Sequence, residues 1–235
     1  MVGTRTPPGA VAEGPARPAA PAPNTGTPAK AEPPAPVRYR GKIEVLVARP
    51  DAGGKERLNE AGELPLKPTD KFRIEGEVDP PAHLYVVWVD PDHDVAPVYP
   101  WDAARGWGTR PAAEQPAAAV SLPSNKANRY TAPRAKPGVA TMVLCARPAP
   151  LDVSDDAVEG WFRELPEVAR PPGGDGAAVW FDGYTEVKEP ARLRTFGEVG
   201  SDDPLARWPG RLQKSLGGKA SYQTAVSFAR TGTAK

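Results

Sequence analysis

The stretch "DPDHD", Asp90–Asp94, places three carboxylates and one of the chain's two histidines within five residues. Its aspartates match positions one, three and five of a calcium-binding EF-hand loop, which then requires Gly at position six and a bidentate Glu at position twelve. Val95 and Trp101 hold those two positions instead. Asp, Pro and Asp in succession are typical of a type I turn. We therefore predict a polar hairpin turn, with a weak surface calcium site as the alternative.

Cys145 is the single cysteine, and it could form a catalytic Cys–His pair only with His83 or His93. A catalytic thiol needs an exposed, electropositive setting. Cys145 instead lies in the apolar run "GVATMVLCAR", where a small buried hydrophobe is the commoner role.

The chain has neither a Gly-x-Ser-x-Gly elbow nor a Walker-type phosphate loop. We expect no catalytic, metal-binding or cofactor-binding residue and no enzymatic activity. A divergent hydrolase that uses carboxylates or the Cys145–histidine pair is the alternative.

Tyr99, Trp101 and Trp107 are the aromatic residues that could bind a ligand. They lie in "VYPWDAARGWG", at a strand end and in the loop that follows. Exposed aromatics beside prolines can form a groove for a sugar or a polyproline peptide. The competing interpretation, which we favour, is that these side chains cover the end of a sheet.

Composition divides the chain into two parts. Residues 1–37 contain ten prolines and no Leu, Ile, Phe, Tyr or Trp. Such a segment cannot bury enough apolar surface to offset its ordering entropy. We predict a disordered Pro/Ala-rich linker over residues 1–37 and a single mainly-β domain over residues 38–235.

Charge and hydropathy narrow the classes of partner. The whole chain has a formal net charge of +1, and the linker, with three basic and two acidic residues, already accounts for it. Nucleic-acid-binding proteins normally show a basic stripe, because phosphate contacts supply much of their affinity. No stretch approaches the roughly 20 apolar residues of a membrane span. We expect a monomeric, cytoplasmic protein that binds a protein partner rather than nucleic acid.

Hydrophobic periodicity predicts the strands. "KFRIEGEVD" at 71–79 alternates apolar and charged residues, which is typical of a strand with one buried and one solvent-exposed face. "HLYVVWV" at 83–89 and "GVATMVLCAR" at 138–147 are apolar on both faces, which predicts central strands covered on both sides. "VAPVYPW" at 95–101 contains two prolines that cannot donate to a ladder, so it must lie at an edge. The other predicted strands are 42–49, "AVSLP", a hairpin in "AAVWFDGYTEV" that turns at Asp182-Gly183, and a closing strand at 221–230.

Two helices follow late in the chain. Residues 154–165 open with a serine N-cap and two acids in the first turn. Residues 202–218 have a proline at the first helical position and a Gly-Gly stop. Pro209-Gly210 should kink or split this second helix. Because strands follow one another without alternating with helices, we predict an α+β fold that is mainly antiparallel β, a sandwich-like sheet domain with two late helices.

The order of these signals resembles a known bacterial family. "LPLKPTDKFRIEGEVDPPAHLYVVWVDPDHDVAPVYPW" is similar to domain of unknown function 4384. The matching parts are Thr69-Asp70, Phe72–Val78, Leu84–Val89, the Asp90–Asp94 turn and Val98-Tyr99-Pro100.

This resemblance covers roughly residues 40–230, and its motifs are structural. It implies no known activity, cofactor or catalytic residue. It suggests the C-terminal accessory region of bacterial serine/threonine kinase-like and peptidase-like multidomain proteins. We therefore expect a non-enzymatic accessory interaction or sensor module of a signalling or effector system.

The hairpin interpretation predicts the effect of His93→Gly. This change should leave the fold intact or slightly stabilise it, because glycine suits a turn. Thermal melts of the two proteins check the expectation. A large loss of stability would show that His93 has a partner elsewhere in the fold.

Overall fold

The computed structural model describes residues 37–48, 55–57, 64–92, 94–125, 130–131, 137–163, 165, 178–184, 192–196, 202 and 204–231. Contacts between Cα atoms separate Val37–Lys235, as one compact unit, from Met1–Pro36. Apart from Val37, the predicted linker lies outside the described residues, and so does His93.

The described residues form strands and two helices in an order that confirms the predicted mainly antiparallel α+β class. The elements are β1 (Arg40–Ala48), β2 (Lys55–Arg57), β3 (Lys71–Val89), β4 (Val95–Tyr99), β5 (Ala117–Leu122), β6 (Tyr130–Thr131), β7 (Gly138–Arg147), α1 (Asp155–Arg163), β8 (Ala178–Tyr184), β9 (Arg192–Phe196), α2 (Pro204–Ser215) and β10 (Tyr222–Arg230).

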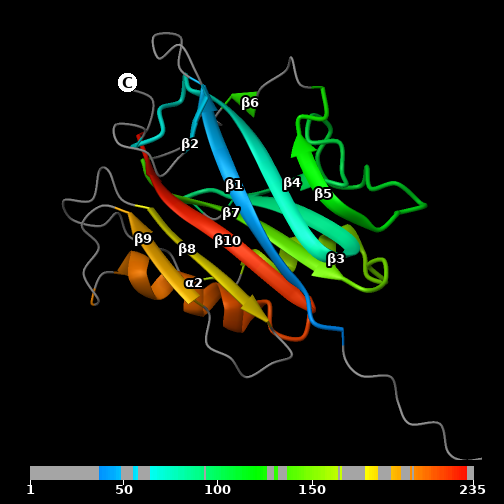
Figure 1. Ribbon diagram of the computed structural model, residues 1–235. Coiled ribbons are helices and arrows are strands. Elements are labelled where there is room, and N and C mark those ends of the chain that lie inside the picture. Colours follow the sequence, from blue (N-terminus) through cyan, green and yellow to red (C-terminus); the bar gives the residue numbers. More distant parts are fainter. Residues whose placement is uncertain are drawn as a thin grey trace, which may run out of the picture. The chain divides into compact units, whose positions relative to one another are not determined.

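Strand β3 belongs to both halves of the curled sheet (Figure 1). Its first half, 71–79, lies between β1 on one side and β5 with β6 on the other. Its second half, 83–89, lies between β7 and β4. The register with β5 shifts between Glu77 and Ala82, where the strand passes from one half to the other. Beyond β7 the sheet continues through β10 and β8 to β9.

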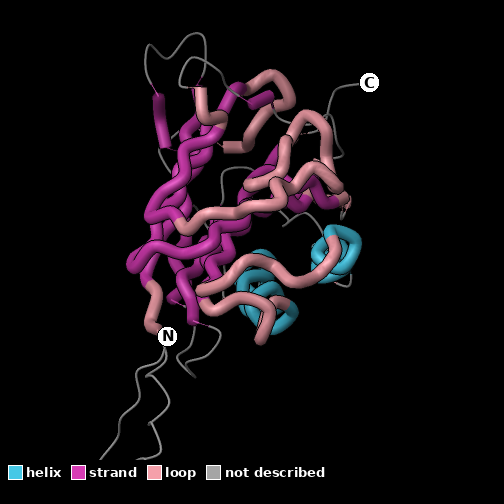
Figure 2. Tube along the Cα trace, turned by 90° about the vertical axis from the view of Figure 1, so that its right-hand side faces the viewer, coloured by secondary structure: helices cyan, strands magenta, loops and turns pink. Residues whose placement is uncertain are grey.

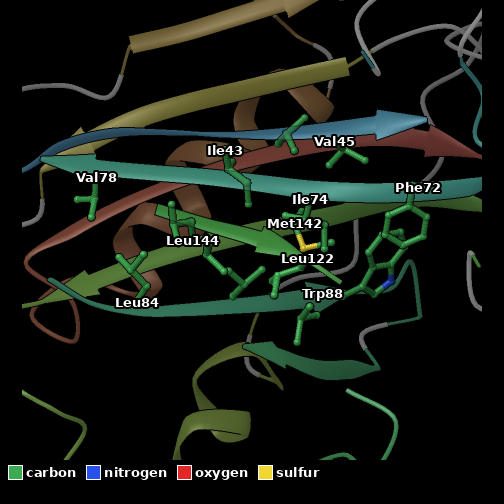
Figure 3. Close-up of a cluster of buried hydrophobic side chains, with 14 of the residues drawn as sticks. Ile43, Val45, Phe72, Ile74, Val78, Leu84, Trp88, Leu122, Met142 and Leu144 are labelled. Atoms are coloured by element: carbon green, nitrogen blue, oxygen red, sulfur yellow. The ribbon is translucent and has the colours of Figure 1, made fainter. Parts of the chain in front are cut away.

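The first core lies between the two halves of this curled sheet. Apolar side chains of β1 and the first half of β3 meet those of the second half of β3, β7 and β10 (Figure 3). The two layers expected of a sandwich-like domain are therefore two halves of one sheet. Prominent members of this core are Ile43, Val45, Phe72, Ile74, Val78, Leu84, Trp88, Leu122, Met142 and Leu144.

The second core lies between the helices and the outer face of the second half of β3, β7 and β10. Figure 2 shows both helices on one face of the sheet. Every residue of 83–89 and of β10 is buried, and so is all of β7 except Arg147. The prediction that 83–89 and 138–147 are covered on both faces is thus confirmed. This core includes Tyr85, Val87, Val143, Cys145, Val158, Phe162, Trp208, Leu212 and Leu216.

Three local predictions need correction. Residues 221–230 do not close the sheet, because β10 lies between β7 and β8. Asp182-Gly183 is not a turn, since both residues pair with β10 inside β8. Residues Pro204–Ser215 form one helix that runs through Pro209-Gly210 instead of splitting there. In each case long-range pairing or packing outweighs the local signal.

The predicted turn at Asp90–Asp94 joins β3 to β4, and Asp90 has a further role. Its backbone N–H donates to the carbonyl of Asp94 at 2.8 Å, which closes the turn. Its carboxylate accepts hydrogen bonds from Trp88 Nε1 at 2.8 Å and from Arg230 Nη1 at 2.5 Å. The Arg230 side chain is fully buried and that of Asp90 is 11% exposed. Burial raises the pKa of Asp90, while the Trp88 bond and the Arg230 charge act to lower it.

This buried ion pair anchors the end of the chain's last strand. The guanidinium of Arg230 also lies over the Trp88 ring, 5.9 Å from its centroid. On the neighbouring backbone, Leu66 N–H donates to Ala229 O at 3.0 Å and Thr231 N–H donates to Leu66 O at 2.9 Å. The loop before β3, the β3–β4 turn and the end of β10 are therefore held together at one place.

Removing the Asp90 carboxylate should be strongly destabilising. Asp90→Ala removes the carboxylate that pairs with the buried Arg230 guanidinium, so we expect a loss of about 3–5 kcal/mol in the free energy of unfolding. Asp92→Ala, in the same turn but exposed, is the matched control and should cost less than about 0.5 kcal/mol. Urea unfolding measures both. Equal effects of the two changes would contradict a structural role for the ion pair.

Candidate functional site

An open cleft lies between β4 and the β5–β6 side of the sheet. It arises because β4 follows the second half of β3 while β5 and β6 follow the first half, and the two sets diverge. Its volume is about 760 Å³, within the range of about 300–1,000 Å³ typical of ligand pockets. The lining residues are Lys71, Val98, Tyr99, Trp101, Asp102, Ala103, Ala104, Leu122, Pro123, Ser124 and Tyr130.

A smaller apolar pocket adjoins this cleft and shares Val98, Ala103 and Tyr130 with it. Its volume is about 160 Å³, and it reaches the first core at Phe72, Ile74, Trp88 and Met142. Trp88 and Phe72 stack with ring centroids 5.3 Å apart. Since Trp88 also donates to Asp90, the floor of the pocket is tied to the buried ion pair.

The structure brings two of the three predicted aromatics to the cleft. Tyr99 is half-buried and Trp101 is 4% exposed, and both line it. Trp107 is not among the lining residues. It packs edge-on against Trp101, with ring centroids 5.1 Å apart, and donates from Nε1 to Val95 O at 3.2 Å. Trp101 belongs to the second core and Trp107 packs against that core.

Sequence reasoning missed Tyr130 and Lys71. Tyr130 belongs to the two-residue strand β6, which pairs with Phe72 and Lys71 of β3. The short polar segment around Tyr130 carries no periodic signal, so only the fold could place its ring across the cleft. Burial raises the pKa of the Tyr130 phenol, which keeps the hydroxyl protonated and able to donate a hydrogen bond.

A polar network holds the later part of the segment after β4, whose earlier residues 101–104 line the cleft. Arg110 Nε lies 3.4 Å from Glu114 Oε1 and 3.3 Å from Asp155 Oδ1, and its Nη2 donates to Val153 O at 2.7 Å. Asp155 is the first residue of α1 and also accepts from Gly108 N–H at 2.9 Å. The segment 108–114 is therefore attached to the start of helix α1.

Tyr85 connects this network to the sheet. Its hydroxyl donates to Glu114 Oε2 and accepts from Leu151 N–H at 2.9 Å. Burial, and then the hydrogen bond to Glu114, raise the pKa of Tyr85 far above its ordinary value. The phenol therefore stays protonated and serves as a fixed donor to the loop.

Cys145 and His83 do not form a nucleophile–base pair. They lie on neighbouring strands, where Cys145 faces Tyr85 and His83 faces Arg147 in register, and no hydrogen bond joins their side chains within the described structure. Cys145 is 5% exposed and belongs to the second core. Burial raises the pKa of its thiol to about 12, so at neutral pH the side chain is the uncharged thiol rather than the nucleophilic thiolate.

The described carboxylates, histidine and cysteine do not gather into a group that could hold a metal ion. Asp90 faces Arg230, and Asp92 and Asp94 are exposed. The helices in the described ranges are too short and too polar to cross a membrane.

In comparisons with known proteins, no family model, no curated protein and no solved structure matches this chain. The resemblance to domain of unknown function 4384 accordingly stays a prediction.

Burial of the Cys145 thiol predicts that it reacts slowly with alkylating reagents in the folded protein. At mildly alkaline pH, still below the raised pKa of about 12, iodoacetamide should leave Cys145 unmodified in the folded protein and modify it fully in denaturant. Intact mass spectrometry counts the label, and the single cysteine makes the result unambiguous. Rapid labelling of the folded protein would show an accessible, activated thiol and would favour the hydrolase alternative.

Proposed function

We propose that this chain is a non-enzymatic binding module that takes its ligand in the cleft between β4 and the β5–β6 side of the sheet. The observation that carries the proposal is the pairing of an open cleft of about 760 Å³ with an apolar pocket of about 160 Å³ at its floor. Concave, mostly apolar sites with a few polar groups are the usual form of ligand pockets.

The chemistry of the lining favours binding over catalysis. Its described side chains contribute one cation, Lys71, one carboxylate, Asp102, and the hydroxyls of Ser124, Tyr99 and Tyr130. Histidine and cysteine are absent from that lining. These groups suit hydrogen bonding and charge pairing at the rim, around an apolar floor.

The ligand we propose is a segment of a partner protein with an apolar side chain. That side chain would enter the pocket bounded by Phe72, Trp88 and Met142, and polar groups beside it would meet Lys71 or Asp102 at the rim. The formal net charge of +1 supports a protein partner over nucleic acid. With the resemblance to domain of unknown function 4384, this supports an accessory interaction or sensor module of a bacterial signalling or effector system.

The hydrolase alternative has weaker support. Its thiol, Cys145, is buried and has a raised pKa. Glu114 and Asp155 are paired carboxylates, but both bind Arg110 and attach a loop to a helix.

A fluorescent probe tests the cleft directly. Anilinonaphthalene sulfonate joins aromatic rings to an anionic group, so it should bind the folded protein at one main site with its rings in the apolar pocket and its charge near Lys71. Ala103 is exposed and lines both cavities, so Ala103→Trp should fill the entrance and weaken probe binding by about tenfold or more.

The matched control is Ala157→Trp, the same change at an exposed position on α1. This variant should bind the probe as the unchanged protein does, and thermal melts should confirm that both variants fold. If Ala103→Trp and Ala157→Trp bind the probe equally, the cleft is not a binding site.

A further inference from the structure

A second pocket lies beside the cleft and shares Tyr99 with it. Its volume is about 270 Å³, and its lining residues are His83, Leu84, Tyr99, Pro100, Pro111, Ala113, Glu114 and Gln115. Pro111, Ala113 and Gln115 are exposed, so this His83 pocket opens at the surface. It is slightly smaller than the range of about 300–1,000 Å³ for drug-sized ligands, which suits a molecule of a single ring.

Its deepest polar group lacks a partner. His83 is 7% exposed, and its Nδ1 has no hydrogen-bond partner among the described residues. A buried polar atom without a partner is uncommon, because the lost hydrogen bond to water is not replaced. A ligand in the pocket would supply that bond.

Glu114 sets the charge that such a ligand should have. Its carboxylate is 9% exposed and already faces the Arg110 guanidinium at 3.4 Å. A cationic ligand would be repelled by the Arg110 guanidinium that lies against Glu114, and an anionic ligand would meet two carboxylates, Glu114 and Asp155, beside that single guanidinium. The pocket therefore suits a neutral molecule.

The hydrogen-bonding groups point to hydroxyls. A carboxylate can accept about four hydrogen bonds, and Glu114 accepts one from Tyr85 besides its contact with Arg110, so it can still accept from a ligand. A hydroxyl both donates and accepts, so it satisfies His83 Nδ1 in either imidazole tautomer. Gln115 adds an amide at the rim.

The remaining lining residues are mostly apolar. Three of them carry rings, Tyr99, Pro100 and Pro111, and the C–H groups of a sugar ring pack well against flat apolar rings. We propose that the His83 pocket binds a neutral monosaccharide unit, with hydroxyls directed to His83, Glu114 and Gln115. This site is separate from the proposed protein-binding cleft and touches it only through Tyr99.

Nuclear magnetic resonance of the imidazole nitrogens tests the proposal. The chain has only two histidines, and His93→Gln identifies which signals belong to His83. The ¹⁵N-labelled protein is titrated with glucose, galactose, mannose and N-acetylglucosamine. At least one of them should shift the His83 nitrogens and leave those of His93 unchanged.

A matched pair of variants locates the binding. Ala113 lines the pocket, and the adjacent Ala112 does not, although both are exposed. Ala113→Trp should abolish the His83 shift, and Ala112→Trp should preserve it. Ala103→Trp, which fills the separate cleft, should also preserve it, so failure of the cleft proposal and failure of this one are distinguishable.

Charged sugars test the expected neutrality. Glucosamine and glucuronic acid should each bind about tenfold more weakly than the best neutral sugar. The proposal is overturned if no neutral sugar shifts the His83 nitrogens, if the shift survives in Ala113→Trp, or if a charged sugar binds as tightly as the neutral one.

Discussion

The pairing of β3 along both of its sides is the constraint on which the rest of the structure depends. A strand of 19 residues is long for a globular domain, and here one half serves each part of the curled sheet. Its neighbours β1 and β7 bring two layers face to face around the first core. On its other side β5 with β6 and β4 diverge, and the cleft lies between them.

Burial on both faces then determines how polar groups must be placed. β7 and β10 lie between two cores, so a polar side chain there needs a partner within the protein. Thr141 and Ser227 meet across the two strands at 2.9 Å, and Trp208 Nε1 of helix α2 donates to Thr141 at 2.7 Å. Arg230 finds Asp90. These bonds oppose a shift in strand register, because a shift would leave buried groups unpaired.

The segment after β4 connects the two proposed binding sites to this framework. Tyr99 lines both the cleft and the His83 pocket. Trp101 and Trp107 cover the second core, and Arg110 and Glu114 attach the segment to α1 and to Tyr85. Loops that carry binding residues are useful when a rigid scaffold positions them, and here the positioning comes from ring packing and a buried network.

The sequence by itself determined the mainly antiparallel class, the strands covered on both faces, the edge character of the proline-containing strand and the β3–β4 turn. These features depend on the periodicity of neighbouring residues, which a single sequence displays. Tertiary structure alone decided that Asp90 is more than a turn residue, since its partner Arg230 is 140 positions away. It also decided that β10 is central, that Asp182-Gly183 stays extended, and that Tyr130 and His83 line cavities. The reason is that pairing between distant strands, and the burial that follows from it, leaves no signal in the local pattern.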